Sequence, residues 1–117
     1  MSDNNSKVFL VNEDIEHEYA GEGVSRQLFG YNENVMLVKV HFAKGAIGAL
    51  HSHPHVQSSY IASGIFEVSI GDQKKILKEG DGYFVPSDVV HGVICLEDGI
   101  LIDSFNPSRA DFLPKLK

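Results

Sequence analysis

Three histidines in the middle of the chain have the residue type and the spacing of a metal site. His51 and His53 lie two residues apart, Gln57 continues the same alternation, and His91 lies in a second stretch farther along. In an extended strand, residues i and i+2 point to the same side, so neighbouring donors of this stretch can grip one ion. Imidazole is a ligand of zinc, copper, iron and nickel. The pattern therefore predicts a divalent metal centre to which His91 contributes from a distant strand.

A second group of chemically capable residues lies near the carboxy terminus. Strand alternation puts Leu101, Asp103 and Phe105 on one face, and Arg109 follows shortly after. An acid within an apolar strand costs several kcal/mol unless it is paired or functional. Asp103 and Arg109 either form a structural ion pair, or Asp103 moves a proton while Arg109 binds a substrate carboxylate through two hydrogen bonds. The residues alone leave both interpretations open.

The elements that must position these side chains are short strands. Runs of Val, Ile, Leu and Phe alternate with turn residues, Gly71-Asp72 has the form of a tight hairpin, and no helical periodicity persists. Many short strands without a long helix predict an all-β, antiparallel sandwich or barrel in a single domain. The segment Pro107–Phe112 is compatible with one helical turn. The expected strands are Lys7–Asn12, Arg26–Tyr31, Val35–Phe42, His51–Gln57, Ser59–Ile70, Gln73–Leu77, Gly82–Val85, Val90–Leu96 and Ile100–Phe105.

Composition excludes several classes of partner. The 117 residues include 10 Lys and Arg against 16 Asp and Glu, a net charge of −6, which disfavours nucleic acid and anionic membranes. The single cysteine, Cys95, rules out an internal disulfide and fits a reducing compartment. The polar start of the chain leads into the short apolar run Val8–Val11, which is too short for an export signal or a membrane span. We therefore expect a cytoplasmic protein.

The two histidine-containing stretches resemble the two signatures of the cupin superfamily. Gly45, His51, His53 and Gly64 stand at the spacing of the first signature, with Gln57 where the family has an acid. The resemblance implies a small jelly-roll barrel, a double-stranded β-helix over about residues 35–106 of one domain 1–117, with the metal inside one end. The second signature is matched by Gly80, Pro86 and His91, but not by Asp88 and Cys95, where the family usually has glycine and often asparagine.

The position of His55 relative to this pattern leaves its role open. Alternation alone puts His55 on the ligand side, whereas the cupin pattern omits it and Pro54 interrupts the alternation. A role next to the ligands or toward the substrate is favoured over ligation. His17 and His41 have no further donors around them in the sequence and stay unassigned.

The glutamine at the acid position changes the charge of the expected site. Three neutral imidazoles and the neutral amide of Gln57 leave the full dipositive charge on the ion, which attracts an anionic ligand and polarises its oxygens. The facial triad of non-haem iron oxygenases contains a carboxylate, which this set lacks. Lewis-acid chemistry on an acidic substrate is therefore favoured over oxidation, although some cupin oxygenases also lack a carboxylate ligand.

The histidine run, the glutamine and the carboxy-terminal motif Asp103-x-Phe105-x-Pro-x-Arg109-x-Asp-Phe together resemble the KdgF family of pectin-degradation cupins. The resemblance implies that 4,5-unsaturated uronate monosaccharides are converted to linear keto-uronates. It places Asp103, Phe105 and Arg109 in the active site. It also implies one divalent ion per chain (nickel, zinc, iron or manganese), held by His51, His53, Gln57 and His91. The family often has an acid before the glutamine, where this chain has Val56.

Alternatives remain for the activity and for the assembly. The chain could be another metal cupin enzyme, such as a small-molecule dioxygenase or a sugar isomerase, or a cupin that senses a sugar or an acid without catalysis. Asp103 favours an enzyme, because a binding module has little need of a proton-transfer acid. The apolar Lys7–Asn12 must be covered or paired. We expect it to be exchanged in a homodimer, the alternative being that it folds back on its own barrel.

Overall fold

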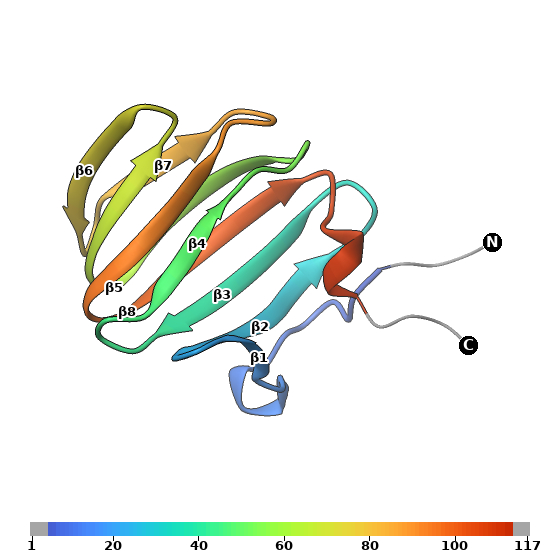
Figure 1. The fold of residues 1–117 in the computed structure, drawn as a ribbon. Coiled ribbons are helices and arrows are strands. Elements are labelled where there is room, and N and C mark those ends of the chain that lie inside the picture. Colours follow the sequence, from blue (N-terminus) through green and yellow to red (C-terminus); the bar gives the residue numbers. More distant parts are fainter. Residues whose placement is uncertain (1–4, 114–117) are drawn as a thin grey trace.

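The computed structural model describes residues 5–113, which form eight strands and two short 3₁₀ turns (Figure 1). All strand pairs are antiparallel, and the strands form two facing layers, as predicted for an all-β cupin barrel. Within this part of the chain, no helix is long and apolar enough to cross a membrane. The elements are η1 (Asn12–Asp14), β1 (Glu18–Gly21), β2 (Val24–Tyr31), β3 (Met36–Phe42), β4 (Ile47–His51), β5 (Val56–Ile70), β6 (Gln73–Lys78), β7 (Gly82–Val85), β8 (His91–Asn106) and η2 (Ala110–Phe112).

Strands β5 and β8 are the longest and connect the two layers. They pair along almost their whole length, from Val56 opposite Asn106 to Ile70 opposite His91. The strand order is β1-β2-β3-β8-β5-β6, while β4 pairs with β8 and β7 pairs with β5. One half of each long strand therefore lies in the layer with β2 and β3, and the other half lies in the layer with β4 and β6.

Two glycines allow β5 and β8 to bend where they pass from one layer to the other. A Cβ atom on Gly64 would lie 2.5 Å from the Cα of Gly99, and one on Gly99 would lie 2.6 Å from the carbonyl oxygen of Ser63. No larger residue fits this close backbone approach. The sequence predicted two strands, Val90–Leu96 and Ile100–Phe105, but the turn residues between them form a bend within the single strand β8.

The prediction for the amino-terminal segment was wrong. The expected strand Lys7–Asn12 is absent, and a 3₁₀ turn begins at Asn12. The segment is attached through polar contacts: the amide Nε2 of the fully buried Gln27 lies 3.3 Å from the carbonyl oxygen of Asn12 and 3.0 Å from that of Ile15. The sequence also missed the edge strand β1, whose residues lack a period-two apolar pattern. The helical turn expected in Pro107–Phe112 is present as η2.

The core occupies the space between the layers and leaves a cavity at one end. Inward-facing positions of β3 and β8 alternate with outward ones, so Met36, Val38 and Phe105 form one buried cluster. A larger cluster borders the same cavity and includes Phe42, Ile61, Phe66, Val68, Val93, Cys95 and Leu101. Burial of these two clusters is the main force that holds the layers together.

Candidate metal centre and active site

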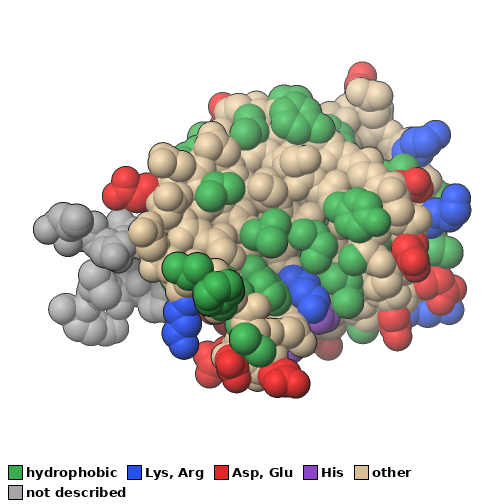
Figure 2. Space-filling model, turned by 180° about the vertical axis from the view of Figure 1, so that it is seen from behind, with side chains coloured by type: hydrophobic (Ala, Val, Ile, Leu, Met, Phe, Trp, Pro, Cys, Tyr) green, Lys and Arg blue, Asp and Glu red, His purple; other side chains and the backbone are tan. Residues whose placement is uncertain are grey.

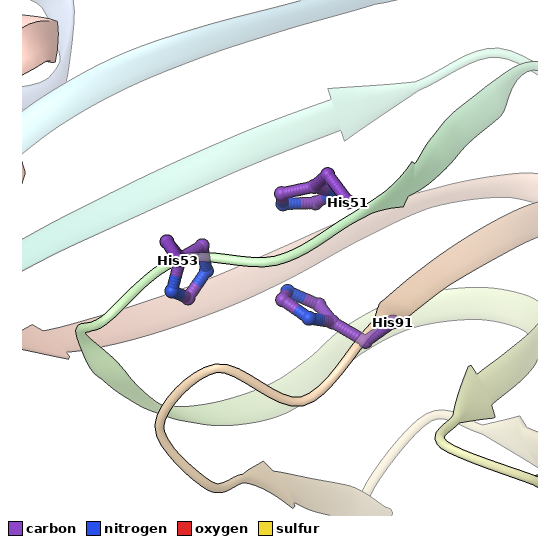
Figure 3. Close-up of side chains that lie close together, drawn as sticks. All are labelled: His51, His53 and His91. Carbon is purple, nitrogen blue, oxygen red and sulfur yellow. The ribbon is translucent and has the colours of Figure 1, made fainter.

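The structure brings the three predicted histidines to one point (Figure 3). His51 ends β4, His91 begins β8, and the two residues are partners in the sheet. His53 reaches the same point from the loop between β4 and β5. One ligand nitrogen of each histidine lies within 4.8 Å of the others, so a single ion can contact all three.

Strand alternation, on which the predicted convergence rested, was the wrong reason for His53. The expected continuous strand His51–Gln57 is broken, because β4 ends at His51 and β5 begins at Val56. A neighbouring loop positions His53 instead, since the backbone N–H of Asp88 donates to its carbonyl oxygen at 2.8 Å. Asp88 has φ 65°, a conformation that favours glycine, which explains the usual family residue there.

Backbone carbonyl groups fix the tautomer of the three imidazoles. The Nδ1 atom of His51 lies 2.8 Å from the carbonyl oxygen of Ala49, that of His53 lies 2.9 Å from the oxygen of His55, and that of His91 lies 2.9 Å from the oxygen of Val89. A carbonyl oxygen only accepts, so each Nδ1 carries a hydrogen, and in the neutral ring each Nε2 then has a free lone pair.

The electrostatics of His91 also fit a bound cation. Its Nε2 atom is buried and has no hydrogen-bond partner among the described residues. Burial lowers the pKa of His91, so the ring stays neutral and keeps its lone pair near neutral pH. A divalent ion at this point would satisfy the otherwise unpaired nitrogen.

Gln57 lies beside the histidines, as the predicted ligand set requires. Its Oε1 atom is 3.2 Å from Nε2 of His53, and its Nε2 atom donates to Ser59 Oγ at 3.0 Å. The lone pair of His53 and the amide oxygen are both acceptors, so the contact between them lacks a hydrogen and is well suited to a cation. The donor set therefore fits a divalent metal ion.

Asp103 is buried next to this group. Its side chain is 8% exposed, and its Oδ1 atom accepts a 2.6 Å hydrogen bond from Ser59. Burial raises the pKa of Asp103 to about 6, although the Ser59 hydrogen bond and the charge of Arg109 lower it. A carboxyl group with this pKa can release and take up a proton near neutral pH.

Arg109 forms its ion pair with a residue other than Asp103. Its Nε and Nη2 atoms donate to the two carboxylate oxygens of Asp111, at 3.0 and 2.9 Å. The structural ion pair that the sequence allowed between Asp103 and Arg109 is therefore absent. The guanidinium carbon lies 5.2 Å from the ring centroid of Phe105 and 4.2 Å from that of Phe112, so aromatic rings hold the cation beside the cavity.

One cavity of about 480 Å³ joins these groups. Of the seven residues predicted for the site, only His53 does not line it. Phe105 forms part of the wall and contacts His53 edge-on, with 5.7 Å between ring centroids. The polar and aromatic lining residues are Arg26, Phe42, His51, Gln57, Tyr83, His91, Asp103, Phe105, Arg109 and Phe112.

Sequence reasoning missed Arg26, Ser59 and Tyr83. Arg26 alternates along β2 with Val24 and Leu28, which also face the barrel interior. The alternation that indicated Asp103 could therefore have identified Arg26 as well. Its guanidinium carbon lies 3.8 Å from the ring centroid of Phe112, and its Nε donates to Glu18 at 3.1 Å. Burial raises the pKa of Tyr83, with the charge of Asp103 acting in the same direction, so this phenol stays neutral. Neither Ser59 nor Tyr83 has a distinctive signal in the sequence.

The remaining histidines lie outside the three-histidine group. The carbonyl oxygen of His55 accepts from His53, and the two rings are 5.4 Å apart, so His55 supports a ligand. His17 and His41 lie 4.7 Å apart between ring centroids, and His41 Nε2 is 2.9 Å from the side-chain oxygen of Gln27. Neither of them lines the cavity that holds the metal group.

Known proteins are similar to this chain in sequence. The cupin domain family matches residues 38–102. The chain is 46% identical over 107 residues to the pectin degradation protein KdgF of Dickeya dadantii, covering 90% of this chain and 97% of that protein. The oxalate decarboxylase OxdC of Bacillus subtilis is 34% identical over 86 residues, covering 69% of this chain but 22% of the longer protein.

Solved structures agree with this relationship. An RmlC-like cupin from Shewanella frigidimarina has a TM-score of 0.92 at 44% identity, covering 94% of this chain and 99% of that one. The structure of KdgF from a Halomonas species has a TM-score of 0.88 at 34% identity, covering 92% and 100%. Agreement in fold, length and sequence shows that the chain belongs to the cupin superfamily and, within it, to the family of KdgF pectin-degradation proteins.

Proposed function

We propose that this protein converts 4,5-unsaturated uronate monosaccharides to linear keto-uronates in the breakdown of pectin or alginate. The observation that carries the proposal is the joint placement, in one cavity, of a metal-binding histidine group and a buried carboxyl group. The kinship with KdgF pectin-degradation proteins supplies the substrate class.

The reaction is an isomerisation that needs a proton transfer and charge stabilisation. The substrate is a cyclic hemiacetal whose ring oxygen is attached to a carbon–carbon double bond conjugated with the carboxylate. Removing the hemiacetal hydroxyl proton forms the aldehyde and breaks the bond from the hemiacetal carbon to the ring oxygen, leaving an enolate. Protonation of the enolate at C4 gives the keto acid. Protons and electrons balance, so no oxidant is required.

Asp103 performs the proton transfer in this proposal. With a pKa of about 6, the ionised carboxylate accepts the hemiacetal proton and returns it to carbon. His51, His53, Gln57 and His91 would hold a divalent ion, which when bound would supply a Lewis acid for the negative charge on the substrate oxygens. Because all four donors are neutral, the ion would keep its full dipositive charge, which suits an anionic substrate.

Arg109 and Phe105 bind and shield the substrate. Two nitrogens of Arg109 are used by Asp111, so the guanidinium is held in one orientation and its remaining N–H groups can donate to a substrate carboxylate or hydroxyl. Phe105 packs against the sugar face and helps to exclude water from the reacting atoms.

We further propose a cytoplasmic homodimer with one nickel, zinc, iron or manganese ion per chain. Nitrogen-rich sites accept several of these ions, so availability decides which one is bound. The dimer is supported by exposed apolar residues of the amino-terminal segment, since Val8 is 85% and Phe9 is 84% exposed. Figure 2 also shows hydrophobic side chains at several places on the face opposite that of Figure 1. Such surfaces are candidates for contact between subunits.

The proposal is tested with an unsaturated uronate freshly generated by a pectate or alginate lyase. The metal-loaded protein should accelerate the loss of ultraviolet absorbance from the conjugated acid, and removal of the metal with a chelator should abolish the acceleration. Equal rates with and without protein would reject the activity and favour a binding cupin. Oxygen consumption by an iron-loaded sample would favour a dioxygenase instead.

A further inference from the structure

We propose that Ser59 is a positioning residue that orients Gln57 as a metal ligand and joins this ligand to Asp103. The inference deepens the proposed function and rests on it. Ser59 lies on β5, two residues after Gln57 and directly opposite Asp103 of β8. Its side chain is 5% exposed and contacts both groups, at 3.0 Å from Gln57 Nε2 and 2.6 Å from Asp103 Oδ1.

The single hydrogen of the Ser59 hydroxyl determines the direction of both contacts. An ionised Asp103 only accepts, so the hydroxyl hydrogen must point toward its carboxylate. The Ser59 oxygen is then an acceptor, and the NH₂ group of Gln57 must be the donor. This arrangement directs the amide oxygen of Gln57 toward His53, at 3.2 Å from its Nε2.

A glutamine ligand needs this help, whereas a carboxylate does not. The two oxygens of a glutamate are equivalent, so either can face the metal. Gln57 has one oxygen and one NH₂ group, and only the oxygen can bind a cation. If the amide turned over, its hydrogens would face the three histidines. Ser59 disfavours this orientation because the reversed amide would place its oxygen against the hydroxyl oxygen.

The same hydroxyl group also acts on the proton-transfer end of the cavity. By donating to Asp103, Ser59 favours the ionised carboxylate, as Arg109 does through its charge. Tyr83 is the other ionisable group that interacts with Asp103, and its phenol also interacts with Ser59 through a side-chain hydrogen bond. One serine thereby connects the orientation of a metal ligand with the protonation of the catalytic acid.

Zinc affinity of the metal-free protein provides the first test. Ser59→Ala should weaken zinc binding about 10- to 100-fold, as is typical for partners that orient a metal ligand. Ser59→Thr keeps a hydroxyl and should restore most of the affinity. Ser58→Ala is the matched control, because Ser58 is the exposed neighbour on β5. Wild-type affinity in Ser59→Ala would overturn the proposal.

A double-mutant cycle separates orientation from general damage to the fold. In a Gln57→Glu background, Ser59→Ala should change zinc affinity less than about threefold, because a carboxylate presents an oxygen either way. An equal loss in both backgrounds would overturn the orienting role.

The pH dependence of turnover tests the link to Asp103. Ser59→Ala should shift the acidic limb of the kcat profile to higher pH, because the Ser59 hydrogen bond lowers the pKa of Asp103. A limb at the wild-type pH would contradict the link. Zinc affinity is measured without substrate, so it tests the orienting role of Ser59 even if the protein does not turn over uronates.

Discussion

The histidine rings and the proton-transfer acid of the cavity differ in the sequence range of the hydrogen bonds that orient them. At the histidine end (His51, His53 and His91), each Nδ1 bonds a carbonyl oxygen only two residues away. At the acid–arginine end (Asp103, Phe105 and Arg109), Asp103 is held by Ser59, 44 residues away in sequence. Local backbone bonds orient the histidines, whereas the proton-transfer end needs the folded barrel and the carboxy-terminal turn. Changes at the two ends should therefore have different signatures.

The largest effect should follow from breaking the histidine end. His91→Ala removes a ligand, so uronate turnover should fall to the rate of the spontaneous reaction and metal affinity should drop by more than about 100-fold. Thermal unfolding with and without zinc gives an independent reading, since zinc should raise the Tm of the wild type but not of this variant. His17→Ala is the control, and a similar loss there would contradict the assignment.

Arg109 should have the largest effect on substrate binding at the acid–arginine end. Arg109→Ala should lower kcat/KM about 100-fold, mainly through KM, because the charged donors for the substrate are lost. Arg109→Lys keeps the charge but not the fixed geometry and should lose about tenfold. Metal content measured on the same samples should not change. A metal-depleted Arg109→Ala protein would show that the two ends are not separable.

The pH dependence of turnover should report Asp103. Its pKa is raised to about 6, so the carboxylate is ionised above this pH and protonated below it. As the base that starts the reaction, it should make kcat fall about tenfold per pH unit on the acidic side. Arg109→Gln should move this limb to higher pH, because the charge of Arg109 lowers the pKa of Asp103. A limb that stays in place would mean that another group titrates.

The smallest effect should come from Arg26, which lines the cavity and supports the acid–arginine end through the ring of Phe112. Arg26→Gln removes the contact with the Phe112 ring and the ion pair with Glu18. The expected loss is about 1 kcal/mol in the free energy of unfolding, with kcat within about twofold of the wild type. Denaturant unfolding of the metal-free protein measures the first quantity. A large fall in kcat would instead place Arg26 among the groups that contact the substrate.

The same contrast explains how much the sequence could predict. The histidine end was predictable because its residues follow a short motif. The position of His53, however, results from the loop at Asp88 and not from strand alternation. Alternation also indicated Asp103 within an apolar strand. It could not reveal that Arg109 pairs with Asp111, nor that Ser59 lies opposite Asp103, because these contacts depend on strand register and on the path of the tail.

The outer parts of the fold were less predictable for a related reason. The run Lys7–Asn12 has the composition of a strand but finds no partner strand in the described chain, and β1 forms from Glu18–Gly21, where the pattern is weak. Strand formation at an edge depends on the neighbour that is available more than on intrinsic preference. The bend of β8 at Gly99 was predicted as a turn between two strands, because local sequence does not distinguish a turn from a bend within one strand.

The central claim is that the metal and the proton-transfer acid are separate parts of one active site. It is tested most directly by measuring bound metal and uronate turnover on the same sample of Asp103→Asn. The substitution keeps the size of the side chain and, in the asparagine Oδ1, an acceptor for Ser59, so the orientation of Gln57 and the metal content should stay as in the wild type while kcat falls about 10²- to 10⁴-fold. Turnover close to the wild-type rate, or loss of metal together with activity, would contradict this division of roles.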